Sequence, residues 1–195
     1  ALEGGKLSIA QPITYLWPFV TIALSVPFLG EIVGIGFLVG AALAAASIFL
    51  IAFPGRGSLG PDAKWGLFAM AFWGFAMFLT KPIVSEGGAF YPVIITRIVF
   101  FAIFFPYSRM FPEKEKKVSL PFGRMFLIGA FNSASFILYN LAVEKTGSSL
   151  PALVSALSPA VVAALSFLFL KERISAKQMV GIGLAVLGLV AVSLI

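Results

Sequence analysis

The chain alternates between long apolar segments and short polar ones, and the apolar segments predict seven membrane-spanning helices. Each is close to the roughly 20 mostly apolar residues that a helix needs to cross a bilayer. None alternates polar and apolar residues as the strands of a membrane barrel do, and a helix satisfies its own backbone in lipid. The predicted spans are Leu7–Leu29, Ile32–Phe53, Trp65–Val84, Ala89–Phe111, Phe122–Val143, Leu150–Leu170 and Met179–Ile195. We therefore expect an all-α, polytopic transmembrane helix bundle.

Turn-forming and charged residues separate these segments. A linker rich in proline and glycine runs from Pro54 to Asp62, and Glu86-Gly87-Gly88 predicts a tight turn. A charged loop covers 112–117, and the polar stretch that begins at Lys171 divides the last two spans. Ser175 is a plausible helix N-cap, because a serine hydroxyl can accept a hydrogen bond from a free N–H of the first turn.

The apolar pattern also repeats. Residues 1–51 match residues 142–192 without a gap, at a constant offset of 141, with 16 identities in 51 positions. Both copies read as an apolar span with an internal proline, then a glutamate, then a second apolar span with a glycine. An internal repeat in an apolar chain is typical of transporters built from two homologous halves.

The position of the repeat predicts the domain organisation. Three apolar segments precede the second copy, so the complete unit should hold five helices. We assign residues 1–53 to the last two helices of a first repeat, 54–64 to a linker and 65–195 to a complete second repeat. The first three helices of the first repeat are then missing from this sequence. Because five is odd, successive repeats would enter the membrane from opposite sides.

Composition agrees with a membrane protein: 60% of the residues are apolar, 11% are charged, and the mean hydropathy is +1.04. The absence of His and Cys excludes disulfides and metal sites built on those residues. Enzyme motifs of the GxSxG, HExxH and P-loop kinds are absent. We therefore expect no enzyme activity, no cofactor, no bound metal and no nucleic-acid partner, and an integral protein of a bacterial or archaeal inner (plasma) membrane.

Loop charges predict the orientation. If the spans alternate sides, eleven basic residues fall in one set of loops and two in the other. Basic loops stay in the cytoplasm. The loop at Glu31 would then be external and the loop from Lys171 to Lys177 internal.

Several motifs resemble the EamA type of the drug/metabolite transporter superfamily. They are Leu141-Ala142-Val143-Glu144, Ser158-Pro159, Phe169-Leu170-Lys171-Glu172-Arg173-Ile174-Ser175, Gln178 and Gly181, with Trp17-Pro18, Phe28-Leu29-Gly30-Glu31 and Gly40 in the first copy. The resemblance implies ten helices in two inverted repeats, and metabolites, amino acids or drugs as substrates. Arg97 also falls where that domain often has an arginine.

Polar and aromatic residues inside the spans are the candidate binding residues. Asn132, Ser135 and Tyr139 share one face of the fifth span, where they either line a cavity or bond a neighbouring helix. We expect them to converge with Tyr15, Trp17 and Trp73 on one pocket. In proteins that the chain resembles, the corresponding helices line the central path.

Other residues have structural alternatives. Pro18 and Pro159, paired by the repeat, are predicted hinges. Arg97 is a predicted buried charge near mid-membrane, either a gate or substrate-anion contact or a clamp on carbonyl groups. Glu31 and Glu172 are expected to anchor helix ends rather than to gate. The four-residue spacing of Gly36, Gly40 and Ala44, and of Gly181 and Ala185, predicts close helix packing, with the seam of a homodimer as the alternative.

These residues favour a secondary transporter that exports or exchanges a small organic solute by alternating access. The aromatic, amide-bearing wall favours an uncharged or zwitterionic solute with an apolar part. The alternative is a non-transporting membrane scaffold or inactive fragment of the same fold. The expected partners are the solute and the lipid bilayer.

Overall fold

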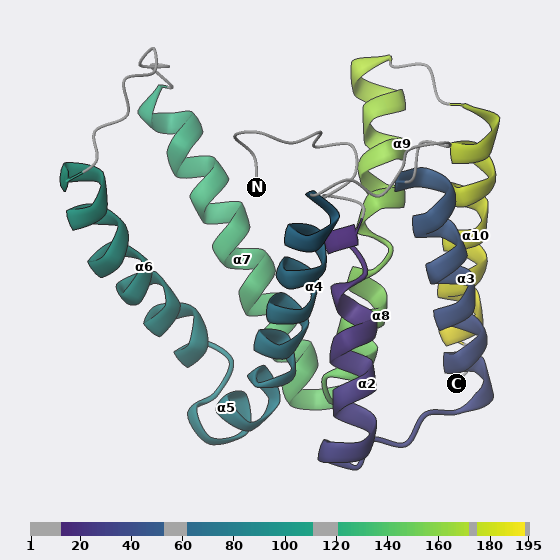
Figure 1. Cartoon of the computed structure of the whole chain (residues 1–195), viewed down its shortest axis with the longest axis horizontal. Coiled ribbons are helices and arrows are strands. Elements are labelled where there is room, and N and C mark those ends of the chain that lie inside the picture. Colours follow the sequence, from purple (N-terminus) through teal and green to yellow (C-terminus); the bar gives the residue numbers. More distant parts are fainter. Residues whose placement is uncertain (1–12, 53–61, 111–120, 172–174, 194–195) are drawn as a thin grey trace. The chain divides into compact units, whose positions relative to one another are not determined.

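The computed structural model describes residues 13–52, 62–110, 121–171 and 175–193, and every regular element in them is an α-helix (Figure 1). This confirms the predicted all-α, polytopic bundle. The helices are α2 (Trp17–Leu29), α3 (Ile35–Ala52), α4 (Asp62–Phe78), α5 (Thr80–Gly87), α6 (Tyr91–Met110), α7 (Phe122–Thr146), α8 (Ser149–Ser155), α9 (Ser158–Leu170) and α10 (Ala176–Ser193).

Five stretches of the described residues are long and apolar enough to cross a membrane: Ala63–Gly87, Tyr91–Met110, Phe122–Thr146, Ser149–Phe169 and Ala176–Ser193. The two apolar helices at 17–29 and 35–51 are shorter. Two of the predicted spans are interrupted: α4 passes into α5 at Leu79, and α8 passes into α9 at Ala156 and Leu157. The predicted loop at 112–117 and most of the linker at 54–64 lie outside the described residues.

The chain divides into two compact units. Unit 1 comprises Ala1–Leu79 with Thr146–Ile195, and unit 2 comprises Thr80–Lys145. This division follows packing. The assignment of residues 1–53, 54–64 and 65–195 to repeats stays a prediction.

Unit 1 holds the helix pairs of both copies of the repeat, and the two pairs share the same bounds. Adding 141 to the limits of α2 and α3 gives 158–170 and 176–193, which are the limits of α9 and α10. The helix stops match as well: Gly30 after α2 (φ 66°) and Lys171 after α9 (φ 53°) both adopt the left-handed conformation. One sequence pattern therefore folds into the same pair of helices twice.

The two copies meet where α3 packs against α10 (Figure 1). A Cβ added at Gly40 would meet the side chain of Val192, and one added at Gly181 would lie 2.6 Å from Cγ1 of Ile51. The two contacts are equivalent under the repeat, because Gly40 corresponds to Gly181 and Ile51 corresponds to Val192 at the offset of 141. Because the start of each helix meets the end of its partner, the two helices are antiparallel and related by a pseudo-two-fold axis. The small residues thus form a packing seam within the chain, as their spacing predicts.

The α10 helix begins with a reciprocal cap. The hydroxyl of Ser175 accepts a hydrogen bond from the N–H of Gln178 at 3.3 Å, and Oε1 of Gln178 accepts one from the N–H of Ser175 at 2.9 Å. This capping box satisfies backbone donors that have no partner within the helix. It confirms Ser175 as an N-cap.

Candidate functional site

Unit 1 contains a matched pair of helix breaks, one in each copy of the repeat. Residues 15–16 and 156–157 form turns just before Pro18 and Pro159. The N–H of Leu16 bonds the carbonyl of Ile13 at 3.1 Å, and the N–H of Leu157 bonds that of Val154 at 3.1 Å. These are the same contact at the 141-residue offset. Proline breaks the helix at both places because it has no N–H and its ring crowds the carbonyl four residues earlier.

The second break has a further adaptation to its proline. Proline at 159 leaves the carbonyl of Ser155 without the N–H that an unbroken helix would supply. The hydroxyl of Ser158 donates to that carbonyl at 2.7 Å. The local chemistry therefore stabilises the bend. The hinge motion predicted for Pro18 and Pro159 stays a prediction.

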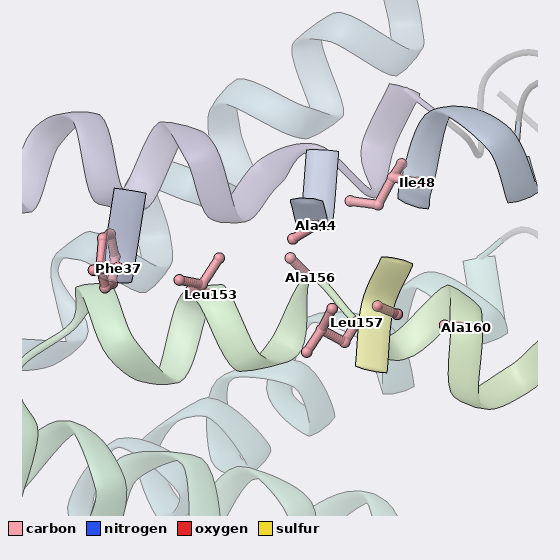
Figure 2. Packing of buried hydrophobic residues seen from close by; sticks show 8 residues of the cluster. Phe37, Ala44, Ile48, Leu153, Ala156, Leu157 and Ala160 are labelled. Carbon is pink, nitrogen blue, oxygen red and sulfur yellow. The ribbon is translucent and has the colours of Figure 1, made fainter. Parts of the chain in front are cut away.

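The breaks lie in the hydrophobic core of unit 1. Leu153, Ala156, Leu157 and Ala160 of the second break are buried in one cluster with residues of α3 and α10 (Figure 2). Tyr15, in the turn of the first break, is partly buried against the same cluster. The breaks thus place non-helical backbone inside packed protein, which is the arrangement tolerated at membrane depth.

Two of the predicted aromatic contacts come from neighbouring helices in unit 1. A Cβ added at Gly74 would lie 2.7 Å from the carbonyl oxygen of Trp17, so α2 and α4 approach closely there. The buried hydroxyl of Thr21 donates to the carbonyl of Gly74 at 2.9 Å and fixes this approach. The segments that carry Trp17 and Trp73 are therefore adjacent. Trp17 is partly buried, whereas Trp73 is 41% exposed.

In unit 2 the predicted polar stripe is partly engaged in bonds to protein. Nη2 of Arg97 donates to Oδ1 of Asn132 at 2.6 Å, and its guanidinium lies over the ring of Phe136, 5.6 Å from the centroid. The hydroxyl of Ser135 donates back to the carbonyl of Asn132 at 2.8 Å. Tyr139, one turn further along, is partly buried. Asn132 therefore orients a charge as well as being a candidate solute contact.

The environment of Arg97 differs from the prediction. Its side chain is exposed, and Nη2 donates to the side-chain amide of Asn132 rather than to a backbone carbonyl. The reason is that α6 has no buried residue along its length. Burial of this charge is thus not seen within unit 2, and α7 supplies its polar and aromatic contacts.

Glu31 anchors a helix end, as expected, but in the other copy of the repeat. Its carboxylate accepts hydrogen bonds from the N–H groups of Ser148 (2.6 Å) and Ser149 (2.8 Å), at the start of α8. Glu172 lies outside the described residues.

Two further polar anchors lie in unit 2, and the sequence did not single them out as sites. Nζ of Lys81 donates to the carbonyls of Val143 (3.1 Å) and Glu144 (3.2 Å), where a cation complements the negative end of α7. Nδ2 of Asn140 donates to the carbonyl of Ala89 at 2.9 Å in a buried position. A lone cation in the apolar third span was the available signal for Lys81.

No group of three or more acidic side chains in the described residues could hold a metal ion. The antiparallel α3 and α10 helices, the paired breaks and the apolar spans define the class of protein: a polytopic, integral membrane protein with a matched pair of helix breaks in unit 1.

Comparison with known proteins then gives the family. The family model of the EamA-like transporter family matches residues 63–194, more than half of the chain, so the chain belongs to that family. An uncharacterized protein of the archaeon Methanocaldococcus jannaschii is 30% identical over 133 residues, which are 66% of this chain and 93% of the relative. A protein crystal structure matches 99% of this chain and 70% of the solved chain, with a TM-score of 0.70 and 16% identity. That likeness concerns the fold alone.

Membership of this family confirms the predicted resemblance and makes the chain a membrane transporter of the drug/metabolite kind. A family of transporters also fits the expectation that the chain is not an enzyme.

Proposed function

We propose that the protein is a secondary transporter that exports or exchanges a small organic solute by alternating access of two inverted repeats. The observation that carries the proposal is the matched pair of helix breaks in unit 1. Discontinuous helices at the interface of inverted repeats are where such carriers commonly bind their solutes. Breaks related by a pseudo-two-fold axis also give two equivalent bending points, one in each copy.

Each unit supplies its own candidate solute contacts. In unit 1 these are Tyr15 at the first break, with Trp17 and Trp73 on the adjoining α2 and α4 helices. In unit 2 they are Asn132, Ser135 and Tyr139 on α7. Aromatic rings with amide and hydroxyl groups favour an uncharged or zwitterionic solute with an apolar part, since rings bury apolar surface and the polar groups fix its orientation.

The direct test is transport by the purified protein in liposomes. A panel of amino acids, other metabolites and amphipathic drugs would be loaded inside, and efflux and counterflow would be followed with labelled solute. We expect at least one zwitterionic or uncharged solute to move faster than in protein-free liposomes. If no solute of the panel moves by either route, the proposal of a carrier is refuted.

A matched pair of variants then tests the polar stripe. Tyr139→Phe removes only a hydroxyl on the stripe, and Tyr91→Phe removes one from an exposed ring at the start of α6. Losing one neutral hydrogen bond to the solute should slow transport by roughly two- to tenfold. We expect that loss for Tyr139→Phe alone, at equal amounts of folded protein. Equal rates for the two variants would remove Tyr139 from the solute contacts.

A further inference from the structure

We propose that Glu31 is a gating residue. Its carboxylate holds the loop after α2 against the start of α8. Release of this contact opens the core of unit 1 at the end where α2 stops and α8 begins. The Glu31 latch is defined here as the Glu31 carboxylate with the backbone N–H groups of Ser148 and Ser149. The inference rests on the proposed alternating access, because a gate needs two states to control.

The geometry of the latch is specific. Each carboxylate oxygen accepts one backbone N–H, Oε1 from Ser148 at 2.6 Å and Oε2 from Ser149 at 2.8 Å. Hydrogen bonds to an ionised acceptor are about twice as strong as neutral ones. The two partners lie 117 and 118 residues away in sequence. The contact therefore closes a long-range interface and does not simply finish a local turn.

The chain makes room for the carboxylate with a glycine. Gly147 has a φ of 84°, in the left-handed region that side chains rarely adopt. A Cβ at this position would lie 2.6 Å from Oε1 of Glu31 and 2.8 Å from its Cδ. Any other residue there would strain the backbone and displace the carboxylate.

The position of the latch is what makes it a gate rather than only a cap. Glu31 belongs to the first copy of the repeat, and Ser148 and Ser149 belong to the second. In alternating access the two copies must separate at one end while they stay together elsewhere. The seam between α3 and α10 is built from small residues in close contact and is suited to the fixed part. The latch is a polar contact at one end, which water can replace.

Three buried hydroxyls at this end of unit 1 also point to opening. Oγ of Ser25, Ser148 and Ser149 is buried and has no hydrogen-bond partner within the described residues. Ser25 lies one turn before the end of α2, and the other two begin α8. Buried polar groups are normally bonded. Opening at this end would expose these three hydroxyls to water, which can bond them, so their position fits a contact that releases.

The test uses cysteine labelling, for which residues 1–195 are suited because they contain no cysteine. Ser25→Cys places a reporter thiol at a fully buried position whose hydroxyl gives up no bond in the described structure. Ser47→Cys is the matched reporter in the α3–α10 seam, also buried. The full protein in liposomes is treated with a membrane-impermeant maleimide, added to each face in separate samples, with and without Glu31→Gln.

Glutamine keeps the size of the side chain, but its NH₂ faces an N–H donor, so at most one of the two bonds survives. We expect Glu31→Gln to raise the labelling rate at position 25 at least tenfold from one face, a shift of about 1.4 kcal/mol. Labelling at position 47 should not change. The control Glu86→Gln, which neutralises an exposed carboxylate at the end of α5, should change neither rate.

Two results would overturn the latch. If position 25 stays protected in Glu31→Gln, the carboxylate does not keep the core of unit 1 closed. If positions 25 and 47 both become reactive, the variant loosens the whole unit and Glu31 is a structural cap. Should Ser25→Cys fail to fold, Ser149→Cys, at another of the three buried hydroxyls, serves as the reporter.

Labelling needs no solute, so the two proposals fail separately. A protein that moves no solute yet opens with Glu31→Gln refutes the carrier and keeps the latch. A carrier whose position 25 stays protected refutes the latch alone.

Discussion

Replacing Gly181 with alanine tests the antiparallel packing of α3 against α10. A Cβ at Gly181 would lie 2.6 Å from Cγ1 of Ile51 and 3.2 Å from the carbonyl oxygen of Ser47. Carbon atoms in contact sit about 3.5–4.0 Å apart, so the added methyl group must push the neighbouring helix away by about 1 Å or force Ile51 into another rotamer. The substitution adds only one methyl group, but at a position where the neighbouring helix leaves no room for it.

The expected cost follows from two opposed terms. Overpacking a close-packed interior costs about 1–3 kcal/mol. Exchanging glycine for alanine in a helix returns up to about 1 kcal/mol. Gly183 is the matched control on the same helix, because a Cβ there meets nothing within 4 Å. Gly183→Ala therefore keeps only the favourable term, and the two variants should differ in stability by about 1–3 kcal/mol.

The assay is thermal unfolding of the purified variants in one detergent. For a chain of this size each kcal/mol shifts the midpoint by about 2–4 °C. Gly181→Ala should thus unfold roughly 2–12 °C below Gly183→Ala. Adding Ile51→Ala to Gly181→Ala should recover much of that gap, since it removes the Cγ1 and Cδ1 atoms that the added methyl group meets, and contacting pairs couple by about 0.5–3 kcal/mol.

The pseudo-two-fold axis supplies an independent check. Gly40→Ala with Val192→Ala repeats the experiment at the partner positions and should give the same sign of coupling. If Gly181→Ala and Gly183→Ala unfold at the same temperature, the described contact between the helices is wrong.

Two further predictions concern polar contacts in unit 2. Asn140→Leu keeps the size of the side chain but leaves the carbonyl of Ala89 without its buried donor, so we expect a loss of about 1 kcal/mol in unfolding experiments; unchanged stability would show that the bond is already replaced by water. A double-mutant cycle of Arg97→Ala and Asn132→Ala should give a coupling energy of about 0.5–3 kcal/mol, and strictly additive losses would mean that the two side chains do not meet.

The helix pairs of unit 1 could be predicted because the repeat has no gap. Proline at 18 and 159, and the left-handed stops at 30 and 171, act on their own few residues, so a match in sequence becomes a match in bounds. The capping box at Ser175 is local in the same sense. Features that depend only on neighbouring residues can be predicted from the sequence.

The contacts between distant residues could not be predicted in the same way. The spacing of Gly40 and Ala44 shows that a helix can be approached closely, but not by which helix, so a homodimer seam stayed open. For Glu31, the sequence predicted an anchor at a helix end but not the groups that it binds. Its partners are backbone N–H groups, which every residue except proline has, so no side-chain pattern marks Ser148 and Ser149 in advance.

The pairing of Arg97 with Asn132 shows the same difficulty in unit 2. Each residue was singled out, one as a charge and one as part of a stripe. Nothing in the sequence indicates that the amide of Asn132 accepts a hydrogen bond from the guanidinium of Arg97, 35 residues away.

The matched stops at Gly30 and Lys171 have a consequence for the charge of the loops that follow the two helices. The backbone turns in the same way after α2 and after α9, yet one copy has a bare glycine there and the other a lysine, at the helix end where a cation is favoured. Basic loops are retained on the cytoplasmic side. The same backbone turn therefore accepts either an uncharged or a basic residue, and exchanging one for the other changes the charge of the loop without changing where the helix ends.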